Sequence, residues 1–307
     1  MMRLIDFHCD TPVELYKKKA SLFENDLMVD LKKAALLGSY TQLAAIFYPP
    51  HLQDSGGMCY VRSVLEYLKR AGATIVCDRT AFQNAVSTKT PAFIPSVEDA
   101  RILNGDLRHI NELYLMGVRF ATLLWRDESI IGGAWNTDVG LTPFGKEAVD
   151  CFLVLGILPD ASHASVASFN DMAALCKKRG KPLIASHSNA FFITPHKRNL
   201  ADWQIRAIAL SGGVIGVNLY PPFLTCEKQA TLDDIMAHIR HLMSVGGEDS
   251  IVLGTDLDGV DALPQTISNV SDLSLLADMM KTSGFTARQI DRLFFENGHR
   301  FLIENLP

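Results

Sequence analysis

Short apolar runs rich in β-branched residues recur along this chain, and segments with helical periodicity separate them. The apolar runs predict strands at 4–7, 43–48, either 74–77 or 92–96, 119–124, 157–162, 182–186, 214–219 and 251–254. Helical patterns cover 144–155, 166–179, 201–211, 231–245 and 286–303, and the last opens with the capping-box sequence Thr286-Ala287-Arg288-Gln289. About eight strands alternating with helices predict an α/β fold, a (β/α)8 TIM-type barrel, with a doubly wound sheet as the main alternative.

A nucleotide-binding fold is disfavoured because the chain has neither a Gly-x-Gly-x-x-Gly loop nor a Gly-x-x-x-x-Gly-Lys loop. The 307 residues are 48% hydrophobic, which is enough for one large core. No long linker, internal repeat or low-complexity segment divides the chain, so we expect one catalytic barrel domain over residues 1–307. Two stretches rich in Gly and polar residues, 49–57 and 126–141, are expected to form long loops over one face of the barrel.

Charge and cysteine content limit the partners and the cellular compartment that we expect for this protein. The net charge is −5 and basic residues are scattered, which argues against a nucleic-acid partner. Six cysteines lie far apart without a Cys-x-x-Cys pair, a pattern typical of reduced, mostly buried thiols in a cytoplasmic protein. We expect no secretory signal, because Met1-Met2-Arg3 leads directly into the first strand without an apolar h-region. We expect no membrane partner, because the longest apolar run, 151–158, is too short to span a bilayer.

Candidate chemistry gathers where predicted strands end, which is where a barrel places its active site. These residues are His8 and Asp10 after the first strand, Glu98 after 92–96, His163 after 157–162, His187 after 182–186, and Asp256 after 251–254. Strand alternation points His8 and Asp10 to one face and Cys9 to the other, so Cys9 is expected in the core. A lone His-x-Asp pair is more often structural, but several such groups on one rim indicate a metal cluster.

The composition of this set suits a pair of metal ions. Three imidazoles and two carboxylates are enough for two ions if one carboxylate bridges them. Two ions about 3.5–4 Å apart can share a hydroxide and polarise a substrate carbonyl. Asp256 then remains free near that water and is placed to move its proton.

The same residues lie in motifs that resemble the membrane (renal-type) dipeptidases, a branch of the metal-dependent amidohydrolases, in their bacterial soluble form. The matching pieces include Asp6-Phe7-His8-Cys9-Asp10, Ser96-Val97-Glu98, Asp160-Ala161-Ser162-His163-Ala164-Ser165, Ser186-His187-Ser188-Asn189, Arg198-Asn199 and Gly254-Thr255-Asp256-Leu257-Asp258-Gly259. They run in the family's order and cover nearly the whole chain. The resemblance implies a (β/α)8 barrel of the amidohydrolase type and a zinc-dependent dipeptidase.

The resemblance also implies a role for each site residue. His8 and Asp10 would hold one Zn²⁺, His163 and His187 would hold a second, and Glu98 would bridge the two ions. Arg198 would bind the terminal carboxylate of the substrate, a role that suits its planar fork. Asp256 would be the general acid and base. The implied substrate is a small dipeptide, with a D-residue tolerated at its C-terminus, and a homodimer is one oligomeric state that relatives adopt.

One position departs from the family pattern. In the mammalian enzymes the segment matching Thr122-Leu123-Leu124-Trp125 ends in a histidine that contacts the substrate oxygen, and here that residue is Trp125. An indole N–H donates one hydrogen bond but cannot become cationic. We therefore expect weaker stabilisation of the oxyanion by Trp125, a role that a metal ion can take over. Tyr220, after the seventh strand, is expected either to line the pocket or to serve in packing.

Plainer interpretations of these residues remain open at this point. Glu98 could lie in the first turn of a helix, where acidic residues are favoured. Arg198 follows His196-Lys197 and could belong to a solvated basic loop. Asp258 could be the catalytic acid in place of Asp256. Alternative functions are hydrolysis of lactones or N-acyl amino acids with the same metals, and a barrel that binds ligands but has lost activity.

Overall fold

The fold is a curled parallel sheet surrounded by helices, as a computed structural model shows for all residues except 1, 50–51 and 53–55. Its strands are β1 (Arg3–Cys9), β2 (Ser39–Phe47), β3 (Thr74–Ile75), β4 (Ala92–Glu98), β5 (Phe120–Thr122), β6 (Leu158–Asp160), β7 (Ile215–Val217) and β8 (Ile251–Leu253). The strand order is β6-β5-β4-β2-β1-β8-β7, with β3 paired to β4. Every strand pair is parallel, and the isolated parallel bridges of Ile184 and Ala185 connect β6 with β7. Closure of the sheet confirms the (β/α)8-type barrel and excludes the doubly wound alternative, which is an open sheet.

Two of the predicted strands differ from the structure. The segments 74–77 and 92–96 were alternatives for one strand, but both contain strands, because β3 pairs with the first residues of β4. The segment 182–186 is not a strand: its contacts are isolated bridges, Asp160 with Ile184 and Ala185 with Ile215. These bridges nevertheless join β6 to β7 and complete the ring of strands around the core.

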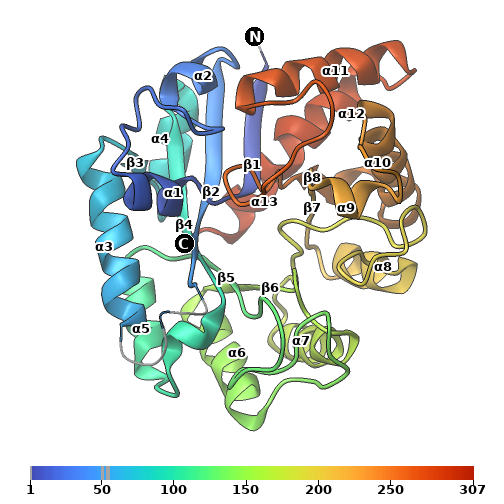
Figure 1. Cartoon of the computed structure of the whole chain (residues 1–307). Coiled ribbons are helices and arrows are strands. Elements are labelled where there is room, and N and C mark those ends of the chain that lie inside the picture. The colour runs from blue at the N-terminus through green and yellow to red at the C-terminus, as the bar shows by residue number, and fades with distance from the viewer. Residues whose placement is uncertain (1, 50–51, 53–55) are drawn as a thin grey trace.

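The helices cover the outside of the sheet (Figure 1). They are α1 (Thr11–Lys18), α2 (Leu31–Ala35), α3 (Gly57–Arg70), α4 (Arg79–Thr88), α5 (Arg108–Leu115), α6 (Pro143–Leu155), α7 (Val166–Arg179), α8 (Asp202–Leu210), α9 (Pro221–Leu224), α10 (Leu232–Gly246), α11 (Leu273–Thr282), α12 (Ala287–Asp291) and α13 (Asn297–Asn305). Short 3-10 turns occupy Ala100–Leu103, Glu248–Ser250 and Val270–Asp272, and a π-helical turn, Arg292–Glu296, joins α12 to α13.

Local sequence signals explain where several helices begin and end. The Thr286 hydroxyl accepts a hydrogen bond from the Gln289 N–H at 3.2 Å, and the Gln289 side chain accepts one from the Thr286 N–H at 2.9 Å. This is the predicted capping box, and it satisfies two helix-end donors. Helix α6 begins after the N-cap Thr142 and ends at Gly156, which adopts the left-handed conformation that favours glycine.

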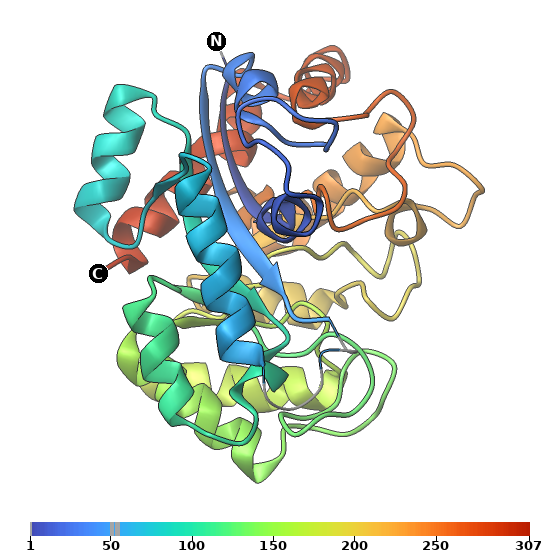
Figure 2. The same ribbon diagram turned by 60° about the vertical axis from the view of Figure 1, so that its left-hand side comes forward.

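The last helix packs against two elements from the first third of the chain. Helix α13 passes next to β1 and reaches α4, where the Arg79 N–H donates to the Pro307 carbonyl at 2.9 Å (Figure 2). All six cysteines are free, but only Cys9 and Cys176 are buried, so the prediction of mostly buried thiols is wrong. Within the described part of the chain, every helix is too short or too polar to cross a bilayer. Part of the loop predicted at 49–57 lies outside the described residues.

Candidate metal centre

The ends of β1 and β8 are tied together beyond the sheet, and this places three predicted site residues side by side. The Asp256 N–H donates to the His8 carbonyl at 2.9 Å, and the Asp10 N–H donates to the Leu257 carbonyl at 3.0 Å. As a result, His8 Nε2 lies 3.5 Å from Asp10 Oδ2 and 3.9 Å from Asp256 Oδ1. The prediction that Cys9 lies in the core is confirmed, because its side chain is fully buried there.

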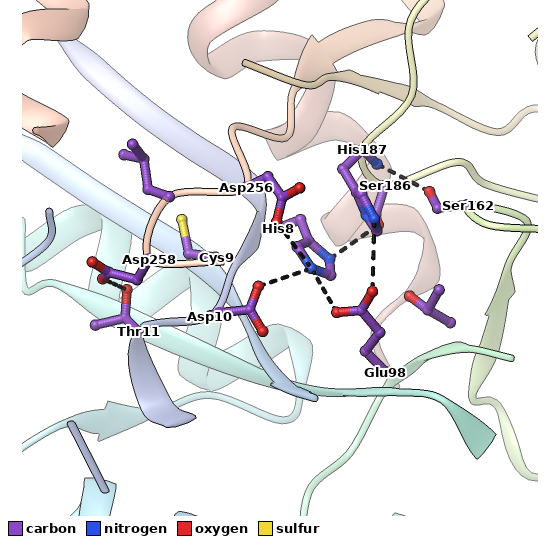
Figure 3. A network of polar contacts seen from close by, with 12 residues as sticks. His8, Cys9, Asp10, Thr11, Glu98, Ser162, Ser186, His187, Asp256 and Asp258 are labelled. Carbon is purple, nitrogen blue, oxygen red and sulfur yellow. Dashed lines mark hydrogen bonds and ion pairs between the residues drawn. The ribbon is translucent and has the colours of Figure 1, made fainter. Parts of the chain in front are cut away.

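Glu98 stands at the centre of the cluster. It is the last residue of β4, so the alternative that it opens a helix is wrong. Its Oε2 lies 3.2 Å from His8 Nε2, and its Oε1 lies 3.9 Å from His187 Nε2 (Figure 3). The same Oε1 lies 3.0 Å from His163 Nε2. One carboxylate therefore faces three imidazoles, which is the arrangement expected of a bridging ligand.

Two of these residues adopt an uncommon backbone conformation. His163 has a φ of 68° and Asp256 has a φ of 64°, both in the left-handed region. Residues other than glycine rarely adopt this conformation, and such residues concentrate at functional sites. Here each follows the end of its strand and turns its side chain into the cluster.

Hydrogen bonds to the ring nitrogens indicate which tautomer each histidine holds. The Trp125 carbonyl lies 2.7 Å from His163 Nδ1, and a carbonyl can only accept, so Nδ1 carries the proton. The Ser186 hydroxyl donates its one proton to Asp160. Its oxygen can then only accept, from His187 Nδ1 at 2.8 Å and from His8 Nδ1 at 3.3 Å. In the neutral form, all three imidazoles therefore carry their proton on Nδ1 and direct Nε2 to the centre of the cluster.

This arrangement fits a bound cation. The Nε2 atoms of His163 and His187 lie 2.9 Å apart, and two lone pairs at that distance repel each other unless a positive charge lies against them. His8, Glu98 and His187 each offer an atom within 4.8 Å of the others, and so do His8, Asp10 and Asp256. Zinc sites typically combine carboxylates with imidazoles. The second ring nitrogen of each imidazole is held by a hydrogen bond to a neighbouring group.

The charges of the cluster shift the pKa values of its members. Burial opposes ionisation of Glu98, but the facing imidazoles of His8 and His163 outweigh it and hold its pKa far below the usual range. Burial also disfavours a charged His8, but Glu98 and Asp10 raise its pKa well above the usual value. Burial and the neighbouring carboxylates of Asp10 and Glu98 raise the pKa of Asp256 to about 7. A carboxyl with that pKa suits proton transfer near neutral pH.

Two buried carboxylates that the sequence analysis did not assign hold the strand ends in place. Asp6, fully buried, accepts hydrogen bonds from the backbone and hydroxyl of Thr255 and from the backbone of His8, linking β1 to β8. Asp160 accepts from the backbone of Ser162, from both the backbone and hydroxyl of Ser186, and from the Thr122 hydroxyl. The signal in the sequence was an acidic residue inside an otherwise apolar strand.

Replacing Asp160 with alanine should therefore destabilise the fold. Four donors from three segments would lose their acceptor, which we expect to cost at least about 3 kcal/mol of unfolding free energy. Urea unfolding measures the loss. The control is Asp150→Ala on the surface of α6, where an ion pair with Arg179 is removed and the loss should be much smaller, because solvent screens the pair. Equal losses in the two variants would contradict the structural role of Asp160.

Asp256 is held by neighbours that were also not predicted. The Asn218 side chain donates to Asp256 Oδ2 at 2.9 Å, and Asn218 is itself held by Asn189, whose side chain donates to its carbonyl at 2.9 Å. Gly259 lies against the same carboxylate, and a Cβ at that position would collide with the Asp10 and Asp256 oxygens. The motif that ends in Gly259 therefore requires glycine at this position, because the Asp10 and Asp256 carboxylates leave no space for a side chain.

The remaining predicted residues line a cavity of about 590 Å³ beside the cluster. Its wall includes Arg198, Trp125 and Tyr220, together with His163 and Asp256. Tyr220 lies in the wall of this cavity and also packs against Phe223, with ring centroids 5.0 Å apart. Trp125 packs its ring against Phe47, with ring centroids 4.9 Å apart.

Arg198 is buried, so the alternative of a solvated loop is wrong. Its Nη2 donates to the His187 carbonyl at 3.4 Å, while its Nε has no hydrogen-bond partner among the described residues. Burial lowers the pKa of Arg198 to about 10, although the charges of Asp256 and Glu98 oppose the shift. A buried guanidinium with a free donor, in the wall of a cavity, is a ready site for an anion.

The sequence of the chain matches the family model described as membrane dipeptidase (peptidase family M19) over residues 1–305. The chain belongs to the M19 dipeptidase family. It is therefore a metallo-dipeptidase, a hydrolase of peptide bonds.

Individual relatives agree with this assignment. A protein of Klebsiella pneumoniae, named for its place in the pqqA 5′ region, is 33% identical over 226 residues, which are 70% of this chain and 82% of that protein. An uncharacterized dipeptidase of Schizosaccharomyces pombe is 32% identical over 208 residues, which are 64% of this chain and 49% of that protein.

Solved structures of two metallo peptidases share the fold, and the first is described as a member of family M19. A metallo peptidase called dipeptidase AC superimposes with a TM-score of 0.89 at 24% identity, covering 99% of each chain. A metallo peptidase from Rhodobacter sphaeroides gives a TM-score of 0.88 at 24% identity, covering 100% of this chain and 99% of that one.

Proposed function

We propose that this M19 protein is a zinc-dependent dipeptidase that cleaves small dipeptides with a free C-terminal carboxylate. The observation that carries the proposal is the pairing of two features in one cavity. Three imidazoles direct Nε2 toward Glu98, and a buried guanidinium with a free donor lies in the wall of the cavity that His163 also lines.

The proposed ligands are His8 and Asp10 for one zinc ion, His163 and His187 for the other, and Glu98 between them. Zinc at this site would polarise the scissile carbonyl and make a water molecule nucleophilic near neutral pH. Asp256 would take the proton of the attacking water and pass it to the leaving amine, because its raised pKa lets it hold a proton near pH 7. Asn218 would keep one oxygen of Asp256 fixed, leaving the other for this transfer.

The short length of the substrate follows from the position of Arg198. Its Nη2 lies 3.4 Å from the carbonyl of His187, a proposed zinc ligand, so a carboxylate bound to Arg198 would lie about one residue length from a scissile bond at the cluster. In support, the Rhodobacter sphaeroides structure is liganded with a phosphinate mimic of the dipeptide L-Ala-D-Ala.

The other side of the cluster favours a free amine over the alternative substrates. A smaller cavity there is lined by the carboxylates of Asp10, Glu14, Glu98, Asp256 and Asp258. Asp10 and Glu98 are proposed zinc ligands and Glu14 pairs with Lys17 at 3.1 Å, so Asp256 and Asp258 are the carboxylates left to face an ammonium. A negative surround stabilises the ammonium of a dipeptide, whereas N-acyl amino acids and lactones have no cation to place there.

A substrate panel with controlled metal tests the proposal. The protein should release amino acids from Ala-Ala with zinc added, lose that activity in chelator, and recover it when zinc is returned. N-acetyl amino acids and homoserine lactones at the same concentration should react far more slowly. Activity that survives complete metal removal, or faster cleavage of an N-acetyl substrate, would contradict the proposal.

Replacing Arg198 with methionine should reduce kcat/KM for Ala-Ala by about 100-fold, because a charge-assisted contact to the carboxylate is lost. The matched control is the substrate Ala-Ala amide, which lacks that carboxylate. The wild-type protein should prefer Ala-Ala to its amide, and the variant should lose this preference while keeping its zinc. A variant that still prefers the free acid would remove Arg198 from carboxylate binding.

A further inference from the structure

Two cavities of unequal size meet at the proposed metal centre. Trp125, His163, Asp256 and Gly259 line both of them, so the cluster lies at their junction. The larger cavity has a volume of about 590 Å³ and the smaller about 190 Å³. A dipeptide whose scissile carbonyl lies at the cluster must place one residue in each cavity.

The charges of the two cavities determine the direction of the substrate, if the proposed function holds. Arg198 lies in the wall of the larger cavity and not of the smaller one. The smaller cavity has no arginine among the described residues of its wall, and its Glu14 is paired with Lys17 at 3.1 Å, so the carboxylate of the substrate is directed to Arg198. The C-terminal residue therefore occupies the larger cavity, and the N-terminal residue with its ammonium occupies the smaller one.

The walls of the smaller cavity limit its size. Val13 is buried in the hydrophobic core, and Phe47 packs against Trp125 with ring centroids 4.9 Å apart. A volume of about 190 Å³ is below the range of about 300–1,000 Å³ for ordinary small-molecule sites. Because close-packed side chains yield little space, this cavity fits a small residue.

The larger cavity has a wall of connected rings. His196 lies over Trp135 and Phe223, with ring centroids 5.6 Å and 4.7 Å apart, and Tyr220 meets Phe223 at 5.0 Å. All four residues line the cavity. Aromatic walls bind bulky apolar and aromatic side chains through buried area and edge-to-face contacts.

We propose that the protein selects dipeptides with a small N-terminal residue, glycine or alanine, and a bulky or aromatic C-terminal residue. This selectivity rests on the proposed dipeptidase function and on the two cavity shapes. Phe47 limits the N-terminal residue, and Phe223 contributes to binding of the C-terminal residue.

The reciprocal dipeptides Ala-Phe and Phe-Ala test the proposal, because they have the same composition and charge. With the zinc-loaded protein and the same C-terminal configuration in both peptides, kcat/KM for Ala-Phe should exceed that for Phe-Ala by at least about 10-fold. Ala-Ala serves as the reference substrate. If Ala-Ala is not cleaved, the dipeptidase function itself fails. If Ala-Ala is cleaved but Phe-Ala equals or exceeds Ala-Phe, only the selectivity is overturned.

Two variants assign the selectivity to its cavities. Phe47→Ala should raise the ratio of Phe-Ala to Ala-Phe cleavage. Phe47→Leu should give an intermediate ratio, and it perturbs folding less because it removes less of the side chain. Phe223→Ala is the matched variant of the other cavity and should lower cleavage of Ala-Phe relative to Ala-Ala. A ratio of Phe-Ala to Ala-Phe that is unchanged in both Phe47 variants would overturn the assignment of Phe47.

Discussion

Replacing Asp256 with asparagine should lower kcat for dipeptide hydrolysis by about 10³-fold or more, the scale of a lost general acid and base. The amide has nearly the same shape and can still meet Asn218, whose donor lies 2.9 Å from Asp256 Oδ2. Asparagine also tolerates the left-handed backbone at this position, where φ is 64°. What it cannot do is accept and return a proton. Metal analysis should find the same zinc content as in the wild-type protein.

Asp258→Asn is the matched control, since Asp258 was the alternative candidate for the catalytic acid. Asp258 accepts hydrogen bonds from the Thr11 hydroxyl and the Met28 N–H, both at 2.7 Å, so it mainly anchors the chain. Its replacement should reduce stability and lower kcat much less than Asp256→Asn does. A larger loss of kcat in Asp258→Asn would move the acid and base role to Asp258.

Glu98→Gln should reduce bound zinc and lower dipeptide hydrolysis by at least about 10³-fold at fixed zinc concentration. The carboxylate faces His8 and His163 at 3.2 Å and 3.0 Å, and a neutral amide cannot balance the charge of two cations there. Zinc content of the purified protein and activity during zinc titration measure the two effects together.

The neighbouring residue provides a matched control for Glu98. Asp99 is also buried, but its oxygens accept from Arg101 instead of facing the cluster. Asp99→Asn should weaken the fold yet keep wild-type zinc content. If Glu98→Gln retained two zinc ions per chain, its role as a bridging ligand would be contradicted.

The strand ends were predictable because a parallel barrel brings the carboxyl ends of its strands to one rim. An apolar run followed by His8, Glu98, His163, His187 or Asp256 was therefore enough to propose a cluster without any distance. The structure brings all five together, although the backbone reaches this arrangement differently than expected. At His163 and Asp256 the turn is made by left-handed residues, which alternation does not describe.

The errors in the strand assignment have a common physical cause. An apolar run records burial, but a strand also needs a continuous hydrogen-bonded partner. Segment 182–186 is buried and yet makes only isolated bridges, whereas Thr74–Ile75 is a strand because the start of β4 offers it an edge.

By itself, the sequence determined the alternation of strands and helices, the family of the chain, and the polar residues at the strand ends. Only the tertiary structure decided the state of those residues. The proton positions on His8 and His187 depend on Ser186 and Asp160, and the free donor of Arg198 depends on burial. These properties come from contacts between segments far apart in the chain, such as the 178 positions separating His8 from Ser186. A local sequence pattern does not predict such contacts. Tertiary packing determines which group hydrogen-bonds to each histidine and whether the Arg198 donor has a partner.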